Sequence, residues 1–239
     1  MTDDQRRTWS APFRPRSYRA LWSTLTTSLQ PVESVDRYVR GTGEYPWTTS
    51  LRTPIGPVRL VVPHPHDVRT VNDIFHRHDY GTGRPRVVVD VGGNIGVSAA
   101  WFLSRSAHTR VHVWEPVPHN LQTLRTNVAR FGDRCVVHEA ALAPQAGPAT
   151  LLVVPLGRSS TLAQSLPTAD GRVAVEVWCE AVDDALRGVL EGEGGHIDLV
   201  KIDTGGSEEA IVDAIAVDVR EAIDEIVYEY PGGVRRLSA

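Results

Sequence analysis

Residues 87–96 read Val87-Val-Val-Asp-Val-Gly-Gly-Asn-Ile-Gly96, and this stretch decides the fold class. The valine run is typical of a strand buried on both faces, which is the usual state of a strand in a parallel sheet. The glycines that follow predict a tight turn from strand to helix, where a ligand can approach the backbone closely. The sequence therefore predicts an α/β domain with a ligand at this turn.

Downstream of the turn, segments with strand character alternate with segments of helical character. The expected strands are 111–114, 135–138, 197–202 and 223–228, and the expected helices are 98–104, 118–131 and 207–215. Because strands joined through helices lie parallel, we expect a doubly wound, mainly parallel sheet. Two further segments, 149–154 and 173–179, flank a polar loop and are expected to form an inserted antiparallel pair.

The first 85 residues do not show this alternation of strands and helices, and they predict an N-terminal α+β cap. We expect a loosely docked arm at 1–16 and helices at 17–29 and 31–41. A hairpin is expected around residues 54–56, followed by a helix capped by Asp67. The predicted organisation is a cap segment over 1–85 and a ligand-binding core over 86–239.

Composition excludes several functional classes. The formal net charge is −4 and no long basic run occurs, which argues against nucleic acid as a partner. The sequence has no run of about 18 apolar residues and no apolar leader, so we expect no membrane partner and a cytoplasmic location. The nine histidines form no metal-binding pattern, so no metal is expected. A homodimer remains an open alternative.

The glycine spacing and the acid before it indicate which ligand binds. A dinucleotide fingerprint requires G-x-G-x-x-G, but counting from Gly92 the third and sixth positions are Asn94 and Val97. Asp90 would repel a pyrophosphate, whereas it suits the ammonium and sulfonium of S-adenosyl-L-methionine. The alternative is a purely structural turn.

A second acid stands at the end of the next expected strand. Glu115 follows Asp90 by 25 residues, in Val111-His-Val-Trp-Glu-Pro116. A carboxylate at this place can accept hydrogen bonds from both ribose hydroxyls of an adenosyl cofactor. The alternative is an acid that caps the following helix.

The order of these and later motifs resembles the FkbM-type methyltransferase family. The segments are VVDVGGNIG, then WEP followed by Asn120, Leu124 and Asn127, then EAAL, VDDAL and IDLVKID–GSE, and the resemblance covers about Thr53 to Glu229. It implies a class I, Rossmann-like fold and methyl transfer from S-adenosyl-L-methionine, with S-adenosyl-L-homocysteine as product. The implied acceptor is a hydroxyl of a sugar or polyketide-like metabolite in natural product biosynthesis.

The resemblance also assigns roles to individual positions. Cofactor contacts are implied for Asp90, Gly92, Gly93, Asn94 and Gly96 at the methionine end, Glu115 and Pro116 at the ribose, and Glu139 and Ala140 at the adenine. Tyr80 is a candidate for closing over the cofactor, and a packed loop aromatic is its alternative. Glu208 matches a family position and is assigned to the substrate.

Three residues are candidates for catalysis. Lys201 and Asp203 are two apart on a strand, so they face the same side near the ligand-binding edge. Asp203 would orient the acceptor or take its proton, Lys201 would stabilise that carboxylate or an alkoxide, and Glu229 would reach the acceptor pocket. A structural ion pair is the alternative for Lys201 and Asp203, and His64 or His66 is an alternative base.

The chain departs from the family pattern at two places. Gly205-Gly206 stands where the family has Glu-Gly, and only ten residues follow Glu229. We therefore expect a shortened C-terminus that lacks the usual antiparallel hairpin. These departures keep open the alternative of a non-catalytic or weakly active assembly subunit. An N-methyltransferase, with a different acceptor, is a further alternative.

Overall fold

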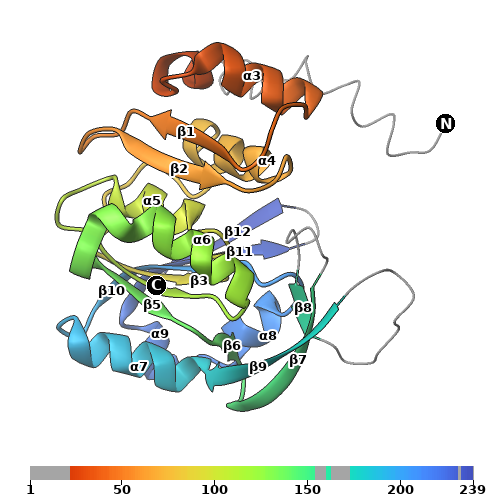
Figure 1. The fold of residues 1–239 in the computed structure, drawn as a ribbon. Helices are drawn as coiled ribbons and strands as arrows, with labels where there is room; N and C mark the ends of the chain where they lie inside the picture. Colours follow the sequence, from red (N-terminus) through yellow and green to blue (C-terminus); the bar gives the residue numbers. More distant parts are fainter. Residues whose placement is uncertain (1–21, 154–159, 163–172, 231–232, 239) are drawn as a thin grey trace. The chain divides into compact units, whose positions relative to one another are not determined.

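A computed structural model describes residues 22–153, 160–162, 173–230 and 233–238 (Figure 1). The chain divides into two compact units, Met1–Gly81 and Thr82–Ala239, which are described separately. The expected arm at 1–16 lies outside the described residues. Of the helix expected at 17–29, residues 22–29 are described: 22–27 are helical, and the helix ends before Ser28, which forms an isolated β-bridge with Leu51.

The described part of the first unit contains helices and an antiparallel pair of strands. Helix α3 (Pro31–Arg40) ends at Gly41, which adopts a left-handed conformation with φ of 65°. Strands β1 (Trp47–Leu51) and β2 (Val58–Val62) pair antiparallel. Helix α4 (Asp67–Val71) runs directly into a π-helical turn, η2 (Asn72–His76).

One detail of this unit differs from the expectation. Asp67 is the first residue of α4 and His66 holds the N-cap position. The Asp67 carboxylate instead accepts a hydrogen bond from the backbone N–H of His64 at 3.0 Å. The acid therefore closes the turn that leads into the helix.

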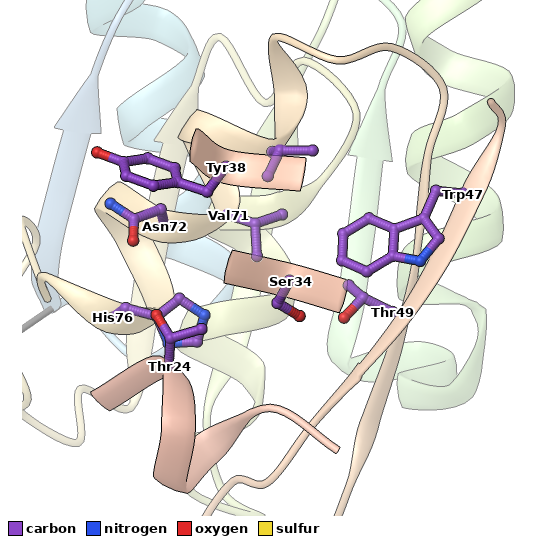
Figure 2. A pocket seen from close by; sticks show the side chains of 9 residues that line it. Thr24, Ser34, Tyr38, Trp47, Thr49, Val71, Asn72 and His76 are labelled. Carbon is purple, nitrogen blue, oxygen red and sulfur yellow. The ribbon is translucent and has the colours of Figure 1, made fainter. Parts of the chain in front are cut away.

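A small pocket lined by both polar and apolar side chains lies within the first unit (Figure 2). Its lining residues are Thr24, Ser34, Tyr38, Trp47, Thr49, Val68, Val71, Asn72 and His76. Burial, assisted by the charge of His78, lowers the pKa of His76 to about 4. The His76 ring stays neutral at physiological pH, with its Nδ1 2.9 Å from Thr27 Oγ1.

The second unit contains a six-stranded sheet in the order β12-β11-β10-β3-β4-β5. Its strands are β3 (Val87–Val91), β4 (Arg110–Trp114), β5 (Cys135–His138), β10 (Ile197–Ile202), β11 (Ile223–Tyr230) and β12 (Gly233–Ser238). The first five run parallel to one another. The predicted α/β sheet is confirmed.

Helices cover both faces of this sheet, so it is doubly wound (Figure 1). Helices α5 (Val97–Leu103) and α6 (Pro118–Val128) lie on one face, and α6 continues into a 3-10 turn, η3 (Ala129–Arg134). Helices α7 (Val182–Gly192), α8 (Glu208–Asp213) and α9 (Val217–Arg220) are associated with the other. All residues of β3 are buried, as expected for a central parallel strand.

The expectation that no hairpin follows the last parallel strand is wrong. Strand β12 pairs antiparallel with β11 in an uninterrupted register from Glu225↔Ser238 to Tyr230↔Gly233. It supplies hydrogen-bond partners to the edge of β11, which would otherwise present unpaired backbone groups. The sequence analysis missed it because this strand is mostly exposed and has little apolar patterning.

The expected inserted pair forms part of a separate four-stranded sheet. Strands β7 (Gly147–Val153) and β9 (Val173–Ala181) pair antiparallel, which confirms the expectation. Strand β6 (Ala141–Ala143) and β8 (Ser160–Leu162) complete the order β6-β9-β7-β8. In the described part of the chain, no helix is long and apolar enough to cross a lipid bilayer.

Candidate active site

The candidate residues gather at the carboxyl ends of the central parallel strands. Strand β3 lies between β10 and β4. The chain first adds β4 and β5 on one side of β3, and later adds β10, β11 and β12 on the other side. This reversal of strand order is the place where doubly wound sheets bind their ligands. Gly92, Glu115 and Asp203 each directly follow a strand at this place.

The glycine turn is held by backbone contacts that leave no room for side chains. The N–H groups of Gly92 and Gly93 both donate to the carbonyl oxygen of Trp114 at 3.0 Å. Gly92 has φ of 77°, and a Cβ on it would overlap the backbone carbonyl of Asp203. A Cβ on Gly93 would overlap the Val113 side chain. The turn therefore depends on glycine for close packing and for its backbone conformation.

Asp90 lies beneath this turn and does not face solvent. Its side chain is fully buried, and Oδ2 accepts a hydrogen bond from Ser98 Oγ at 2.6 Å. Oδ1 forms an ion pair with Lys201 Nζ at 2.9 Å. The charge argument from the sequence needs revision, because the Asp90 carboxylate is already paired with a cation inside the protein.

Lys201 is likewise buried and lies on β10 directly opposite Asp90 on β3. Besides the ion pair, its ammonium donates to the carbonyl oxygens of Val91 at 3.2 Å and Gly92 at 2.7 Å. Burial alone would lower the Lys201 pKa, but the charges of Asp90, Asp203 and Glu229 outweigh it and raise that pKa. Lys201 is a cation within the protein framework, beneath the candidate cofactor site.

Glu115 connects the glycine turn to the segment after β4. Its Oε2 accepts the N–H of Asn94 at 2.8 Å, and its Oε1 accepts the N–H of Val117 at 2.9 Å. Burial raises the Glu115 pKa, whereas these two bonds, one from Asn120 and the Lys201 charge oppose the rise. The ribose-binding role stays a prediction, as does the role of half-buried Pro116 beside it.

Asn94 supplies the observation that tests whether a cofactor fits this turn. Its backbone has φ of 47°, an uncommon left-handed conformation for a residue other than glycine. Its Oδ1 atom is buried and has no hydrogen-bond partner among the described residues. A buried acceptor without a donor is costly, and the ammonium of a methionine moiety would supply one. The residues present therefore fit the methionine end of S-adenosyl-L-methionine.

Asp203 and Glu229 lie at the ends of neighbouring parallel strands. Ile202 on β10 is paired with Tyr228 on β11, so Asp203 and Glu229 are the next residues on the two strands. Asp203 is partly exposed and Glu229 is exposed, which makes both accessible to an acceptor. Both act electrostatically on Lys201, so the structure brings the three predicted catalytic residues into one neighbourhood.

Glu208 organises the loop between β10 and α8. Its carboxylate accepts the backbone N–H of Thr204 at 2.7 Å and of Gly206 at 2.9 Å. Burial would raise the Glu208 pKa, but backbone N–H groups, including its own and those of Thr204 and Gly206, lower it overall. These contacts give Glu208 a structural role in the loop, and its assignment to the substrate stays a prediction.

The remaining predicted cofactor residues occupy different surroundings. Glu139 is exposed, follows β5 and pairs with Arg125, whereas Ala140 beside it is buried. Their assignment to the adenine stays a prediction. Gly96 has φ of 82° and is the N-cap of α5. Tyr80 is buried within the first unit, and its closure over the cofactor stays a prediction.

Two residues that the sequence analysis did not assign to the site support it directly. Ser98 orients Asp90, and Asn120 donates to Glu115 Oε1 at 3.2 Å. A third, Asn127, holds the carbonyl oxygen of Ile95 at 2.8 Å. Asn120 and Asn127 belong to the motif after WEP, but a spacing alone does not reveal which acceptor an amide reaches.

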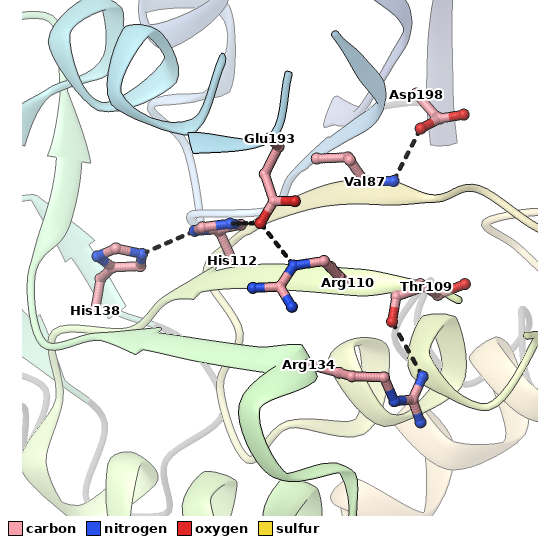
Figure 3. Close-up of polar contacts among 8 residues, drawn as sticks. All are labelled: Val87, Thr109, Arg110, His112, Arg134, His138, Glu193 and Asp198. Atoms are coloured by element: carbon pink, nitrogen blue, oxygen red, sulfur yellow. Dashed lines mark hydrogen bonds and ion pairs between the residues drawn. The ribbon is translucent and has the colours of Figure 1, made fainter. Parts of the chain in front are cut away.

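The other parts of the sheet carry polar networks without a predicted role (Figure 3). His112 Nε2 and Arg110 Nε both contact Glu193 Oε1, at 3.0 and 2.7 Å, and His138 lies next to His112. At the amino ends of β10 and β11, Asp198 accepts the N–H of Val87 at 2.8 Å. Asp198 also joins His196 and Asp224 in a group of potential metal ligands within 4.8 Å of one another, which sequence spacing did not reveal.

Comparison with known proteins supports the interpretation of the second unit as a methyltransferase domain. The family model described as the methyltransferase FkbM domain matches residues 90–229. No curated protein matches the chain.

Several solved structures of methyltransferases match part of the chain at low identity. An O-methyltransferase from Bacillus cereus in complex with S-adenosylhomocysteine is 16% identical over 60% of this chain and 49% of its own, with a TM-score of 0.35. A precorrin-6y C5,15-methyltransferase from Geobacter metallireducens is 20% identical over 59% and 51%, with a TM-score of 0.31. A Podospora anserina methyltransferase bound to S-adenosylhomocysteine is 10% identical over 96% and 70%, with a TM-score of 0.35. The chain thus spans about half the length of the first two.

Proposed function

Because this chain belongs to the FkbM methyltransferase family, we propose that it transfers a methyl group from S-adenosyl-L-methionine to a hydroxyl of a small metabolite. A sugar or a polyketide-like natural product is the acceptor class that we favour. The observation that carries the proposal is the placement of the glycine turn, Asp203 and Glu229 at the ends of neighbouring parallel strands.

The cofactor would be held by groups that the structure places around the turn. Asn94 offers its unpartnered buried oxygen, and the glycine backbone allows close approach of a ligand. Glu115 directly follows β4, and we propose that its carboxylate would accept hydrogen bonds from the ribose hydroxyls. When bound, S-adenosyl-L-methionine supplies an electrophilic methyl group on a sulfonium.

Asp203 is the residue that we propose as the base. An alkyl hydroxyl is a poor nucleophile while it keeps its proton, so methylation needs a proton acceptor or close in-line positioning. The Asp203 carboxyl is partly exposed at the sheet edge, where an acceptor hydroxyl can reach it. Glu229, at the end of the adjacent strand, would hold a second acceptor hydroxyl and orient the first.

The partners that we propose follow from charge and composition. A net charge of −4 disfavours a polyanionic acceptor such as nucleic acid and suits a small hydroxylated molecule. Both cysteines are free, in agreement with a reducing cytoplasmic setting. A homodimer is compatible with this function but is not required by it.

Calorimetric titration with S-adenosyl-L-methionine and S-adenosyl-L-homocysteine tests the cofactor. We expect micromolar binding to the native protein, and binding that is lost in Glu115→Ala. Asp224→Asn removes an exposed carboxylate at the opposite end of the sheet and should bind like the native protein. Absence of binding by the folded native protein would reject the proposal.

A methylation screen with sugars, hydroxylated polyketide-like compounds and primary amines tests the acceptor. Methylated hydroxyl products, absent in Asp203→Asn, would support O-methylation. Transfer only to amines would indicate an N-methyltransferase. Tight cofactor binding without any turnover would favour the assembly-subunit interpretation, in which case a Gly205→Glu change that created activity would identify what is missing.

A further inference from the structure

Lys201 is the only lysine of the chain, although Lys and Arg together number 25. It lies at the centre of the candidate site and not on the surface, with a side chain that is 2% exposed. An ammonium has three N–H donors, and Lys201 directs them at Asp90 Oδ1, the Val91 carbonyl and the Gly92 carbonyl. An arginine, with a planar fork of five donors, could not reproduce this arrangement in the same space.

These contacts connect the two halves of the sheet where the strand order reverses. Lys201 belongs to β10 and its three acceptors belong to β3 or to the turn that follows it. On the other side of the turn, Gly92 and Gly93 donate their N–H groups to the carbonyl oxygen of Trp114 on β4. Lys201 therefore fixes the carbonyl side of the turn while Trp114 fixes the N–H side.

The charges around Lys201 give it a second effect. Asp90, Asp203 and Glu229 all favour its protonated form. The Lys201 charge in turn acts on Glu115, which burial alone would drive toward the neutral acid. One buried ammonium thus interacts with four acidic groups, and the Lys201–Asp90 pair contributes no net charge beneath the turn.

We propose that Lys201 is a positioning residue that fixes the glycine turn and balances the charge of Asp90 beneath the cofactor. This inference rests on the proposed function, because it requires that S-adenosyl-L-methionine bind at the turn. The balance matters because the cofactor carries a positive sulfonium, whereas the product carries a neutral sulfur. Asp203 and Glu229 then remain as the acidic groups that favour the charged cofactor over the product. Loss of the charge balance between Lys201 and Asp90 should therefore change the affinity for S-adenosyl-L-methionine more than the affinity for S-adenosyl-L-homocysteine.

Ligand discrimination in charge-altered variants tests this inference. Asp90→Asn leaves the Lys201 charge without its partner, so affinity for S-adenosyl-L-methionine should fall about tenfold more than affinity for S-adenosyl-L-homocysteine. The double variant Asp90→Asn with Lys201→Met replaces the pair with neutral groups of similar size. The double variant should restore the native ratio of the affinities for the two ligands. Both affinities should still be weaker, because the turn has lost the contacts from the Lys201 ammonium.

Two further variants separate charge from shape. Lys201→Arg keeps the charge and should keep the ratio while weakening both ligands, because the three-donor geometry is lost. Asp224→Asn removes the same charge at the opposite end of β11 and should leave ratio and affinities unchanged. Circular dichroism on each variant would establish that the fold is retained.

A lysine-specific NMR signal gives a readout that does not depend on ligand. Protein labelled with ¹³C at lysine Cε should show one lysine resonance, because Lys201 is the only lysine. We expect this resonance to titrate above pH 10.5 in the native protein, and at lower pH in Asp90→Asn. A resonance that does not respond to Asp90→Asn would overturn the inferred pairing.

The outcomes distinguish this inference from the proposed function. Equal losses of both ligands in folded Asp90→Asn would overturn the charge balance while leaving the cofactor assignment intact. Failure of the native protein to bind either ligand would reject the proposed function and the charge inference together. The NMR response would then still decide whether Lys201 pairs with Asp90.

Discussion

The Cα atom of Gly92 lies against the backbone carbonyl of Asp203, so closely that any Cβ on Gly92 would overlap that oxygen. This packing joins the end of β3 to the segment after β10, which carries the proposed base. The Asp203 N–H completes the junction by donating to the carbonyl oxygen of Val91 at 3.1 Å. The glycine turn and Asp203, the proposed base, are therefore placed by one backbone junction.

Gly92→Ala should disrupt this junction. The left-handed conformation alone costs an alanine about 1–2 kcal/mol, and the overlap with a backbone oxygen adds to this because neither strand can move easily. We expect a lower free energy of unfolding and loss of cofactor binding, measured by urea denaturation and calorimetry.

Gly194→Ala is a matched control for the Gly92 variant. Gly194 has φ of 84°, and a Cβ there would meet nothing within 4 Å. The free energy of unfolding of Gly194→Ala should fall only by the cost of placing alanine in the left-handed conformation, and the variant should bind the cofactor like the native protein. Equal effects of the two substitutions would contradict the importance of the Gly92–Asp203 contact.

Glu115→Gln should weaken the site without unfolding the protein. A glutamine keeps one acceptor oxygen, so either the Asn94 or the Val117 N–H loses its partner at a cost of about 1–3 kcal/mol. We expect a lower melting temperature and at least a tenfold loss of cofactor affinity. Glu139→Gln, at an exposed position after β5, is the control and should retain the native melting temperature.

Glu208→Gln should change the pH dependence of stability. The folded-state pKa of Glu208 is lowered from 4.5, so its stabilising contribution is present above that value and is lost as pH falls through the lower folded pKa. The variant should be about 1–2 kcal/mol less stable at pH 7, with the difference shrinking below pH 4. Denaturant midpoints of native, Glu208→Gln and the exposed control Glu209→Gln across this range provide the measurement.

His76→Asn should flatten a second pH dependence, in the first unit. The folded-state pKa of His76 is about 4, below its ordinary value of 6.5, so the unfolded chain takes up a proton first as pH falls. Stability from the neutral ring is complete above pH 6.5 and is lost between 6.5 and 4, by about 3 kcal/mol. A native protein whose thermal stability is constant over this range would contradict the assignment.

Asp203→Asn should separate catalysis from binding. If Asp203 accepts the acceptor proton, turnover should fall about 10²- to 10⁴-fold, far more than the modest loss of S-adenosyl-L-methionine affinity expected when one of the acidic groups that favour the sulfonium is neutralised. Glu229→Gln should raise the KM for the acceptor more than it lowers kcat, because orientation is its proposed task. Comparable activity of Asp203→Asn and native protein in a radiolabelled methyl-transfer assay would exclude Asp203 as the base.

Local patterns were sufficient to predict the central architecture. The run Val87–Val89, the glycines after it and the alternation of strands with helices all depend on neighbouring residues, whose conformational preferences act without distant partners. The family motifs were also recognisable from the sequence, since each occupies a short segment in a strand or soon after one. The exposed strand β12 was missed because its formation depends on pairing with β11, not on apolar periodicity.

The sequence by itself determined which residue types end the strands, and therefore that acids and glycines meet at one edge of the sheet. Only the tertiary structure decided how those acids are used. Register across β3 and β10 places Lys201 opposite Asp90, and this pairing of residues 111 positions apart converts an expected ligand contact into an internal ion pair. The physical reason is that a buried charged side chain pairs with the opposite charge that the neighbouring strand brings close to it. Which strands become neighbours depends on the order of strands in the sheet, and local sequence does not determine that order.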